Sequence, residues 1–210
     1  MRRSARVLTL ILLIPALGSA GAQPATAADA GPVVGSWATY QRTSTLAEEI
    51  PVLVRQSDPR GRETWTVSRE RVAPAPLFVT YSIVRGDATR YVLQVVTAAT
   101  LDGPPLSVTQ VTVERASGKA IRSVTQRPQG VIATPESGIR PFRQADARGP
   151  EEVVTVPAGR FSAVRMPYAD GTVWVSDQVP ALRLVRGEYG NARLELVRSD
   201  ARGARDLLSP

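Results

Sequence analysis

The chain has 210 residues with 26 basic and 19 acidic side chains, a formal net charge of +7, no cysteine and no histidine. Without cysteine, disulfides, thiolate metal sites and an acylated N-terminal cysteine are excluded, so we do not expect a lipoprotein. Without histidine, the usual general base of hydrolases and the commonest metal ligand are missing.

The first 22 residues have the pattern of a secretory (Sec-type) signal peptide. Arg2, Arg3 and Arg6 accompany an apolar run from Val7 to Leu17, and small residues follow. The apolar run is well short of the roughly 20 residues that cross a bilayer. We therefore expect cleavage near Ala22, no transmembrane anchor afterwards, and a periplasmic or extracellular protein. Loss of the three arginines lowers the net charge from +7 to +4.

A single β domain is predicted for residues 36–198, preceded by a flexible leader over residues 23–35 and followed by a frayed tail over residues 199–210. The leader is rich in alanine, proline and glycine and lacks an apolar period, and the tail contains one glycine and a closing proline. The remaining length suits one domain with its own core.

Within the domain, short runs of alternating apolar and polar residues are separated by turns rich in glycine and proline. Between the first two runs, Thr45 and Glu48 have capping-box spacing, which indicates one helical turn or a loop. Residues 106–126 are predicted to form a hairpin of two strands that turns at residues 117–119. The other predicted strands cover residues 36–42, 52–57, 63–72, 77–85, 89–99, 151–156, 161–166, 172–176, 184–188 and 192–198.

About eleven short strands at meander spacing, without a long helix, predict an all-β fold. We expect a single, curved, mostly antiparallel meander sheet of half-barrel shape with little helix. The most apolar runs, 77–85 and 89–99, should lie at its centre. Residues 127–150 contain four prolines and three glycines and are expected to form an irregular loop. This loop either covers one end of the core or acts as a lid.

One run changes its apolar phase. Leu106 and Val108 fall in one phase of the alternation, whereas Val111 and Val113 fall in the other. This change predicts a β-bulge near Gln110, and a bulge would bend the sheet.

Few residues suit catalysis or metal binding. Glu48-Glu49 and Glu151-Glu152 are adjacent pairs, and neighbours on a strand point to opposite faces, so neither pair converges by itself. Lys119 is the only lysine and lies in a predicted turn. The acidic loops lack calcium-loop spacing. We predict no catalytic residue, no metal and no cofactor, although two carboxylates from distant strands could still form an acid/base pair.

Three tryptophans and five tyrosines remain as binding candidates. On alternating strands such residues pack in a core, or they line a cleft where the sheet curves around one. Tyr81, Tyr91 and Trp174 are the predicted lining of such a cleft.

The last third of the chain carries a string of turn and core residues. A Val-Pro-Ala-Gly turn with Pro157 and Gly159 precedes a strand led by Phe161, and then follow Trp174 and Pro180. The string resembles the ending of a loose group of exported, mostly uncharacterised bacterial β-rich proteins, similar in shape to the curved sheets of lipoprotein carriers. The resemblance implies that these residues set turns and pack the core, and that the concave face holds an apolar ligand. Arg183 departs from the pattern, because the group usually has glycine there.

Three functions follow as hypotheses. The first is an exported, non-enzymatic module that binds an apolar or lipidic ligand on a curved β-sheet. The alternative is a structural or accessory protein of the cell envelope that docks on another protein, and the third is a carboxylate-only hydrolase. The arginines are scattered singly rather than clustered, so no nucleic acid is expected as a partner.

Overall fold

The computed structural model describes residues 32–44, 48–57, 63–72, 74–128, 130–134, 149–168 and 171–208, with the backbone alone in 48–57, 63–72 and 131–134. The predicted signal peptide and most of the leader lie outside these residues. The described residues form strands and no helix. The strands are β1 Trp37–Ser44, β2 Glu48–Ser57, β3 Glu63–Val72, β4 Leu77–Gly86, β5 Arg90–Ala98, β6 Pro105–Glu114, β7 Ala120–Arg127, β8 Gly130–Thr134, β9 Glu151–Val156, β10 Gly159–Tyr168, β11 Gly171–Val175, β12 Leu184–Tyr189 and β13 Ala192–Asp200.

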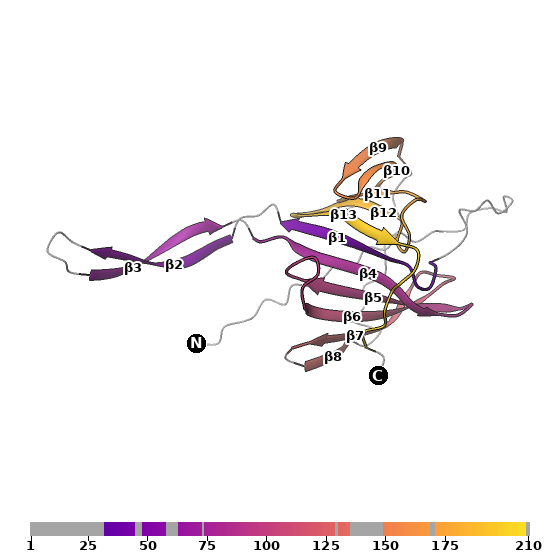
Figure 1. Cartoon of the computed structure of the whole chain (residues 1–210), viewed down its shortest axis with the longest axis horizontal. Helices are drawn as coiled ribbons and strands as arrows, with labels where there is room; N and C mark the ends of the chain where they lie inside the picture. The colour runs from indigo at the N-terminus through magenta and orange to yellow at the C-terminus, as the bar shows by residue number, and fades with distance from the viewer. Residues whose placement is uncertain are drawn as a thin grey trace.

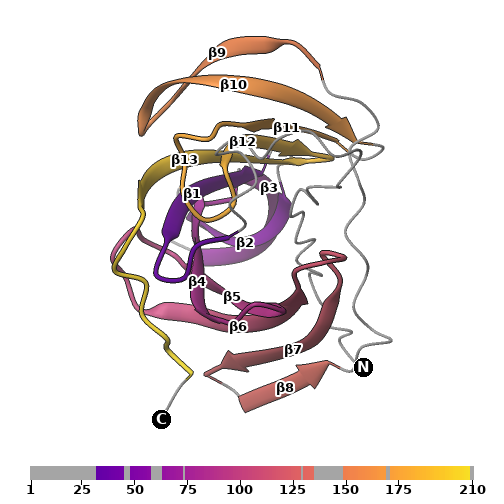
Figure 2. The same cartoon turned by 90° about the vertical axis from the view of Figure 1, so that its right-hand side faces the viewer.

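Eleven strands form one open antiparallel sheet in the order β8-β7-β6-β5-β4-β1-β13-β12-β11-β10-β9. The predicted all-β, meander-like antiparallel sheet is thereby confirmed. From β1 the chain runs outward through β4 to β8 on one side, and β9 to β13 return on the other side (Figure 1). The sheet is curved but neither closed nor strongly curled, and no described strand links β8 to β9 (Figure 2).

The central strand is β1, and the predicted centre strands β4 and β5 lie beside it on one side. On the other side β13 pairs with β1 from Trp37↔Asp200 to Ser44↔Ala192. The two ends of the domain therefore meet in the middle of the sheet. Local pattern could not predict this, because the pairing joins segments that lie far apart in the sequence.

The strands β2 and β3 form a separate two-stranded sheet that stands away from the large sheet (Figure 1). Their pairing is continuous from Glu48↔Val72 to Ser57↔Glu63. The helical turn or loop expected to begin at Thr45 is therefore wrong for residues 48–50, since the ladder with β3 extends the strand to Glu48. Thr45 itself lies outside the described residues.

On β1, β4, β5 and β6 the main core covers one face of the sheet, which we call the inner face. On β5 it takes Tyr91, Leu93 and Val95, and β6 adds Val111 and Val113. These side chains are almost fully buried. Burial of each is worth about 1.5–3 kcal/mol relative to exposure, which makes the alternation of these strands the main determinant of the fold.

The bulge predicted near Gln110 is absent from the ladder between β5 and β6, but on the other side of β6 the register with β7 shifts close by, between Thr112 and Val113. The register between β5 and β6 runs unbroken through Leu93↔Val111, Gln94↔Gln110 and Val95↔Thr109, and the shift comes later, between Thr97 and Ala98. The apolar phase changes along β6 because both of its faces are covered. Val108 is buried on the opposite, outer face, and it is not part of the main core.

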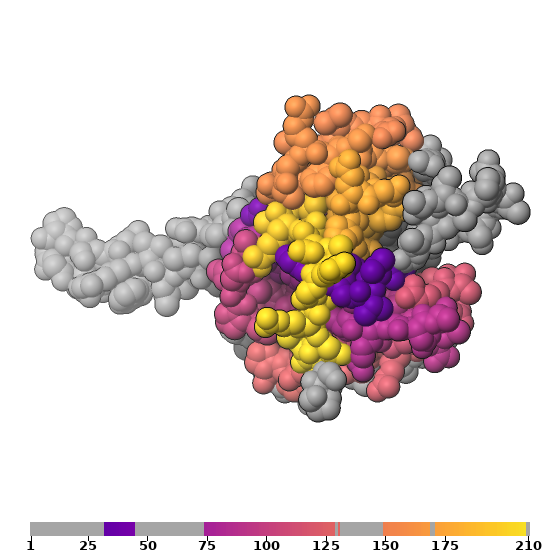
Figure 3. Space-filling view, turned by 45° about the vertical axis from the view of Figure 1, so that its right-hand side comes forward, coloured from indigo at the N-terminus to yellow at the C-terminus, as the bar shows by residue number. Residues whose placement is uncertain are grey.

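The outer face is covered by the C-terminal segment, residues 203–207, which we call the strap. Gln94 Nε2 donates to the Arg205 carbonyl at 2.9 Å, and the Leu207 amide donates to Gln94 Oε1 at 2.8 Å. Figure 3 shows this segment (yellow) lying across the surface of the sheet. The expected frayed tail is therefore wrong for residues 199–207, because residues 199–200 belong to β13 and the strap is bonded to β5, whereas residues 209–210 lie outside the described residues.

The region 127–150 also differs from the expectation, because it contains the edge strand β8 (Gly130–Thr134). Its apolar residues pair with β7 from Ser123↔Thr134 to Arg127↔Gly130. Whether this region acts as a lid depends on residues 135–148, which lie outside the described part of the chain.

At the other edge the β9–β10 hairpin folds back toward β12 and β13. The Ala158 amide in its turn donates to the Leu196 carbonyl at 3.0 Å, and Arg186 Nη2 donates to the Thr155 carbonyl at 2.8 Å. These bonds use backbone groups that would otherwise be open at the sheet edge.

Candidate functional site

The inner face is the place where the sequence predicts a ligand cleft, and its own side chains fill it. Tyr40 on β1 is fully buried, and its hydroxyl donates to the Leu184 carbonyl on β12 at 2.8 Å. The Tyr40 ring meets the Tyr81 ring edge-on, with centroids 5.5 Å apart and an interplanar angle of 71°. This contact ties β1, β4 and β12 together across the face, as expected for a packed core.

Two of the predicted ligand residues, Tyr81 and Tyr91, belong to this packing and are 6% and 5% exposed. Burial raises the pKa of each to about 12, although Arg42 and Arg115 respectively act to lower it. Burial also raises the pKa of Tyr40 well above its ordinary value. The three phenols therefore stay neutral at physiological pH, so none of them acts as a general base there.

The third predicted ligand residue, Trp174, is buried in the same hydrophobic cluster as the tyrosines but comes from a different face of the sheet. Trp174 pairs with Arg186 on β12, Arg186 pairs with Glu195 on β13, and Glu195 pairs with Gln41 on β1. Paired residues share a face, and Gln41 is the neighbour of Tyr40 in the strand. Trp174 is therefore on the face of the sheet opposite Tyr40. Its indole N–H donates to the Glu152 carboxylate on β9, and Arg186 lies 5.6 Å from its ring centroid. The three aromatic residues therefore belong to one buried cluster but do not share one face of the sheet.

The predicted turn and core motif is assembled around the fold-back hairpin. Gly159 has φ +131° in the β9–β10 turn, a conformation that favours glycine. Pro157 is exposed in the same turn, Phe161 packs against the core, and Pro180 lies half-buried in the loop between β11 and β12.

Arg183, the departure from that pattern, stands in the left-handed region with φ 60°, as does Ala181 with φ 64°. A non-glycine residue there carries strain of order 1 kcal/mol. Arg183 forms an ion pair with Asp177 across the loop, which offsets part of this strain. The loop in turn places Val179 and Leu182 in the core.

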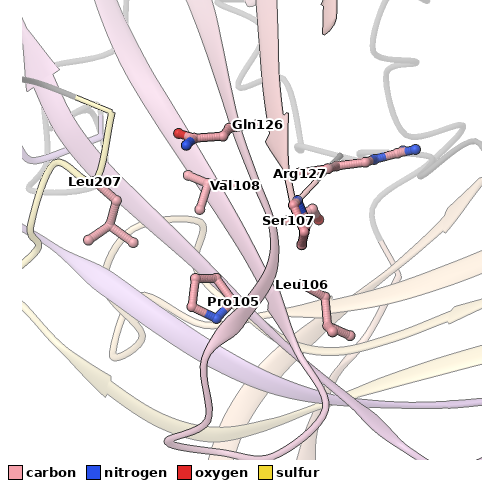
Figure 4. A pocket seen from close by; sticks show the side chains of 8 residues that line it. Pro105, Leu106, Ser107, Val108, Gln126, Arg127 and Leu207 are labelled. Carbon is pink, nitrogen blue, oxygen red and sulfur yellow. The ribbon is translucent and has the colours of Figure 1, made fainter. Parts of the chain in front are cut away.

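The outer face carries a shallow groove of about 360 Å³ beside the strap. Leu207 from the strap and Val108 from β6 lie around the same space in Figure 4, with Pro105 below them and Gln126 above. Leu207 is 48% exposed, so the groove is open to solvent. The lining residues are Pro105, Leu106, Ser107, Val108, Gln126, Arg127, Pro128 and Leu207.

A buried polar cluster holds the strap in place. Gln94 and Gln110 stand opposite each other on β5 and β6, and they are 2% and 8% exposed. Gln110 Nε2 donates to Asp206 Oδ1 at 2.6 Å, and Arg85 Nε forms an ion pair with Asp206 Oδ2 at 2.8 Å. The sequence analysis missed this cluster. The sequence feature that could have indicated this cluster is the pair of glutamines within two apolar runs. Buried glutamines need hydrogen-bond partners, so a polar group must lie on the same face.

The carboxylates expected to be weak catalytic candidates have structural contacts. Glu151 accepts from Ser162 Oγ at 2.6 Å, and Glu152 accepts from Trp174. The structure does not describe the side chains of Glu48 and Glu49. In the side chains that the structure describes, no three histidine, cysteine, aspartate or glutamate residues group as metal ligands. Nor do the described residues contain an apolar helix of membrane-spanning length.

No family model matches the chain, and no match was found among the curated proteins or among the solved structures. The function is therefore argued from geometry alone.

Proposed function

We propose that the chain is a non-enzymatic accessory protein of the cell envelope that docks on another protein. The observation that carries this proposal is the filled inner face, where Tyr40 contacts both the Tyr81 ring and the Leu184 carbonyl in place of a ligand. A curved sheet that holds an acyl chain needs an open apolar cleft on that face.

Two features of the backbone support docking. The outer side of β8 pairs with no strand that the structure describes, and the residues of β8 include neither a charge nor a proline. Edge strands of this kind readily accept a strand from another chain. The β2–β3 hairpin also pairs with no strand of the large sheet. Enzymatic function receives less support, because Glu151 and Glu152 are already hydrogen-bonded to neighbouring side chains.

Native mass spectrometry of the mature form, residues 23–210, tests the proposal together with photo-crosslinking in the host. We expect a bare protein at its own mass and a covalent adduct with one other protein when a photoreactive residue replaces an exposed residue. A bound species of acyl-chain mass, together with no protein adduct from any exposed position, would refute docking.

A second candidate is binding of an apolar ligand in the outer-face groove. Its specific support is a volume of about 360 Å³ with Val108, Leu207 and Pro105 in its lining, which falls at the lower end of ligand pockets. Leu207→Asp should then abolish retention of an added fatty acid. Val153→Asp, a matched change at an exposed valine on β9, should leave it unchanged. Equal retention by both variants would exclude the groove.

A further inference from the structure

We infer that the β2–β3 hairpin is a docking arm that inserts into a groove of a partner protein, and that the groove is apolar at its centre and acidic along one wall. This inference rests on the proposed docking function and names the surface and the chemistry of the partner.

The first argument is the isolation of the hairpin. Each strand has ten residues, and all ten rungs from Glu48↔Val72 to Ser57↔Glu63 are paired. No strand of the large sheet pairs with either of them, and Figure 1 shows the hairpin extending away from it. An isolated two-stranded hairpin is marginally stable in water. A hairpin of this length therefore needs a surface to cover it.

The second argument is the distribution of charge along the rungs. The three central rungs, Val52↔Ser68, Leu53↔Val67 and Val54↔Thr66, contain no charged residue. The rung on each side of them contains an arginine, in Pro51↔Arg69 and Arg55↔Trp65. An uncharged centre with charged ends is the anatomy of a protein–protein interface. A bilayer-inserting hairpin would instead have apolar residues at its far end, where Ser57↔Glu63 stands.

The surface area of the hairpin indicates how a partner must cover it. Ten residues per strand span about 33 Å, and two strands are about 10 Å wide, so each face of the hairpin covers roughly 330 Å². A stable interface buries about 800 Å² on each partner. One face provides less than half of this area, whereas both faces together approach it. A groove that encloses the hairpin meets the requirement, and flat stacking of the arms of two copies does not.

The charges specify one wall of that groove. Alternation along the strands places Leu53, Val67, Arg55 and Arg69 on the same face. Between the Arg55 and Arg69 rungs this face has no acidic residue. Complementary charge at an interface steers association and selects partners. The wall that contacts this face should therefore carry aspartate or glutamate on both sides of an apolar centre.

Photo-crosslinking in the host, with the full chain, tests the arm. A photoreactive phenylalanine analogue replaces Leu53, Val54 or Leu106 in turn. The first two positions sample the two faces of the hairpin, and the third samples an exposed residue of the large sheet. We expect adducts of positions 53 and 54 with the same protein, identified by peptide sequencing, and aspartate or glutamate in the peptide linked to position 53.

Charge reversal provides the specificity control. Arg55→Glu with Arg69→Glu should lower the adduct yield about tenfold, equivalent to about 1.4 kcal/mol of binding. Arg122→Glu with Arg160→Glu makes the same charge change at exposed positions of the large sheet and should leave the yield unchanged. Both double variants should keep the thermal midpoint of the unmodified protein, since the hairpin pairs with no strand of the large sheet.

Every other result of these experiments contradicts the docking arm, the docking function or both. Adducts with a second copy or with lipid, adducts from one face alone, or equal losses in both double variants would overturn the arm. An adduct with a protein from position 106 alone would overturn the arm and leave the docking proposal standing. If no position yields a protein adduct, the arm and the docking proposal both fail.

Discussion

Removal of one oxygen atom tests whether the inner face is a core or a cleft. In Tyr40→Phe the ring and its edge contact with Tyr81 remain, but the bond to the Leu184 carbonyl is lost. A buried acceptor left without its donor costs about 1–3 kcal/mol. For a chain of this size, a loss of about 2 kcal/mol lowers the melting temperature by about 6 °C.

Urea unfolding followed by tryptophan fluorescence measures this loss, which should appear as a lower midpoint with an unchanged slope. The control is Ser162→Ala, which removes an exposed hydroxyl that donates to Glu151. This variant should lose less than about 0.5 kcal/mol. If Tyr40→Phe cost no more than the control, water would have to reach the Leu184 carbonyl. The inner face would then be an open cleft, and the argument against ligand binding there would fail.

Further predictions concern pH, the strap and a strand contact. Because folding raises the pKa of Tyr81 and Tyr91 to about 12, the stability from keeping them neutral is complete below pH 10 and is lost as the pH rises toward 12. Each contributes ~1.4 kcal/mol per pH unit in that window. Urea unfolding between pH 8 and 12 should show this decline, and Tyr81→Phe should make it shallower; an unchanged slope would contradict the burial of Tyr81. Asp206→Ala should cost about 2 kcal/mol, because Asp206 anchors the strap to Gln110 and Arg85. Asp102→Ala, which breaks an exposed ion pair with Arg198, should cost less than about 1 kcal/mol by the same assay, and equal losses would mean that the strap is not docked. In Gly171→Ala the new methyl group would overlap the Glu188 carbonyl oxygen on β12. The variant should lose at least about 2 kcal/mol in thermal unfolding, and a wild-type melting temperature would exclude this close approach.

Strands such as β5 could be predicted from local pattern because alternate residues are buried in the core. Tyr91, Leu93 and Val95 share one phase, and burial of that phase against the core decides the orientation of β5. The turn at Gly159 could also be predicted from the sequence, because the positive φ that the turn requires favours glycine.

The candidate site was less predictable. Tyr81, Tyr91 and Trp174 were predicted to line one ligand cleft because all three are aromatic residues on strands with an alternating pattern. Their separation onto two faces follows from the register of β11, β12 and β13, which depends on partners distant in sequence. Buried aromatic residues look the same in sequence whether they line a cleft or fill a core.

By itself the sequence determined most of the strands, though not β8, and which chemistry is missing, because periodicity and residue type act locally. Only the tertiary structure decided that β13 pairs with β1, that the strap covers the Gln94–Gln110 pair, and that β2 and β3 stand apart. Each of these depends on contacts between segments far apart in the chain. Such contacts form only when the buried area and hydrogen bonds of the whole sheet offset the entropy of closing long loops.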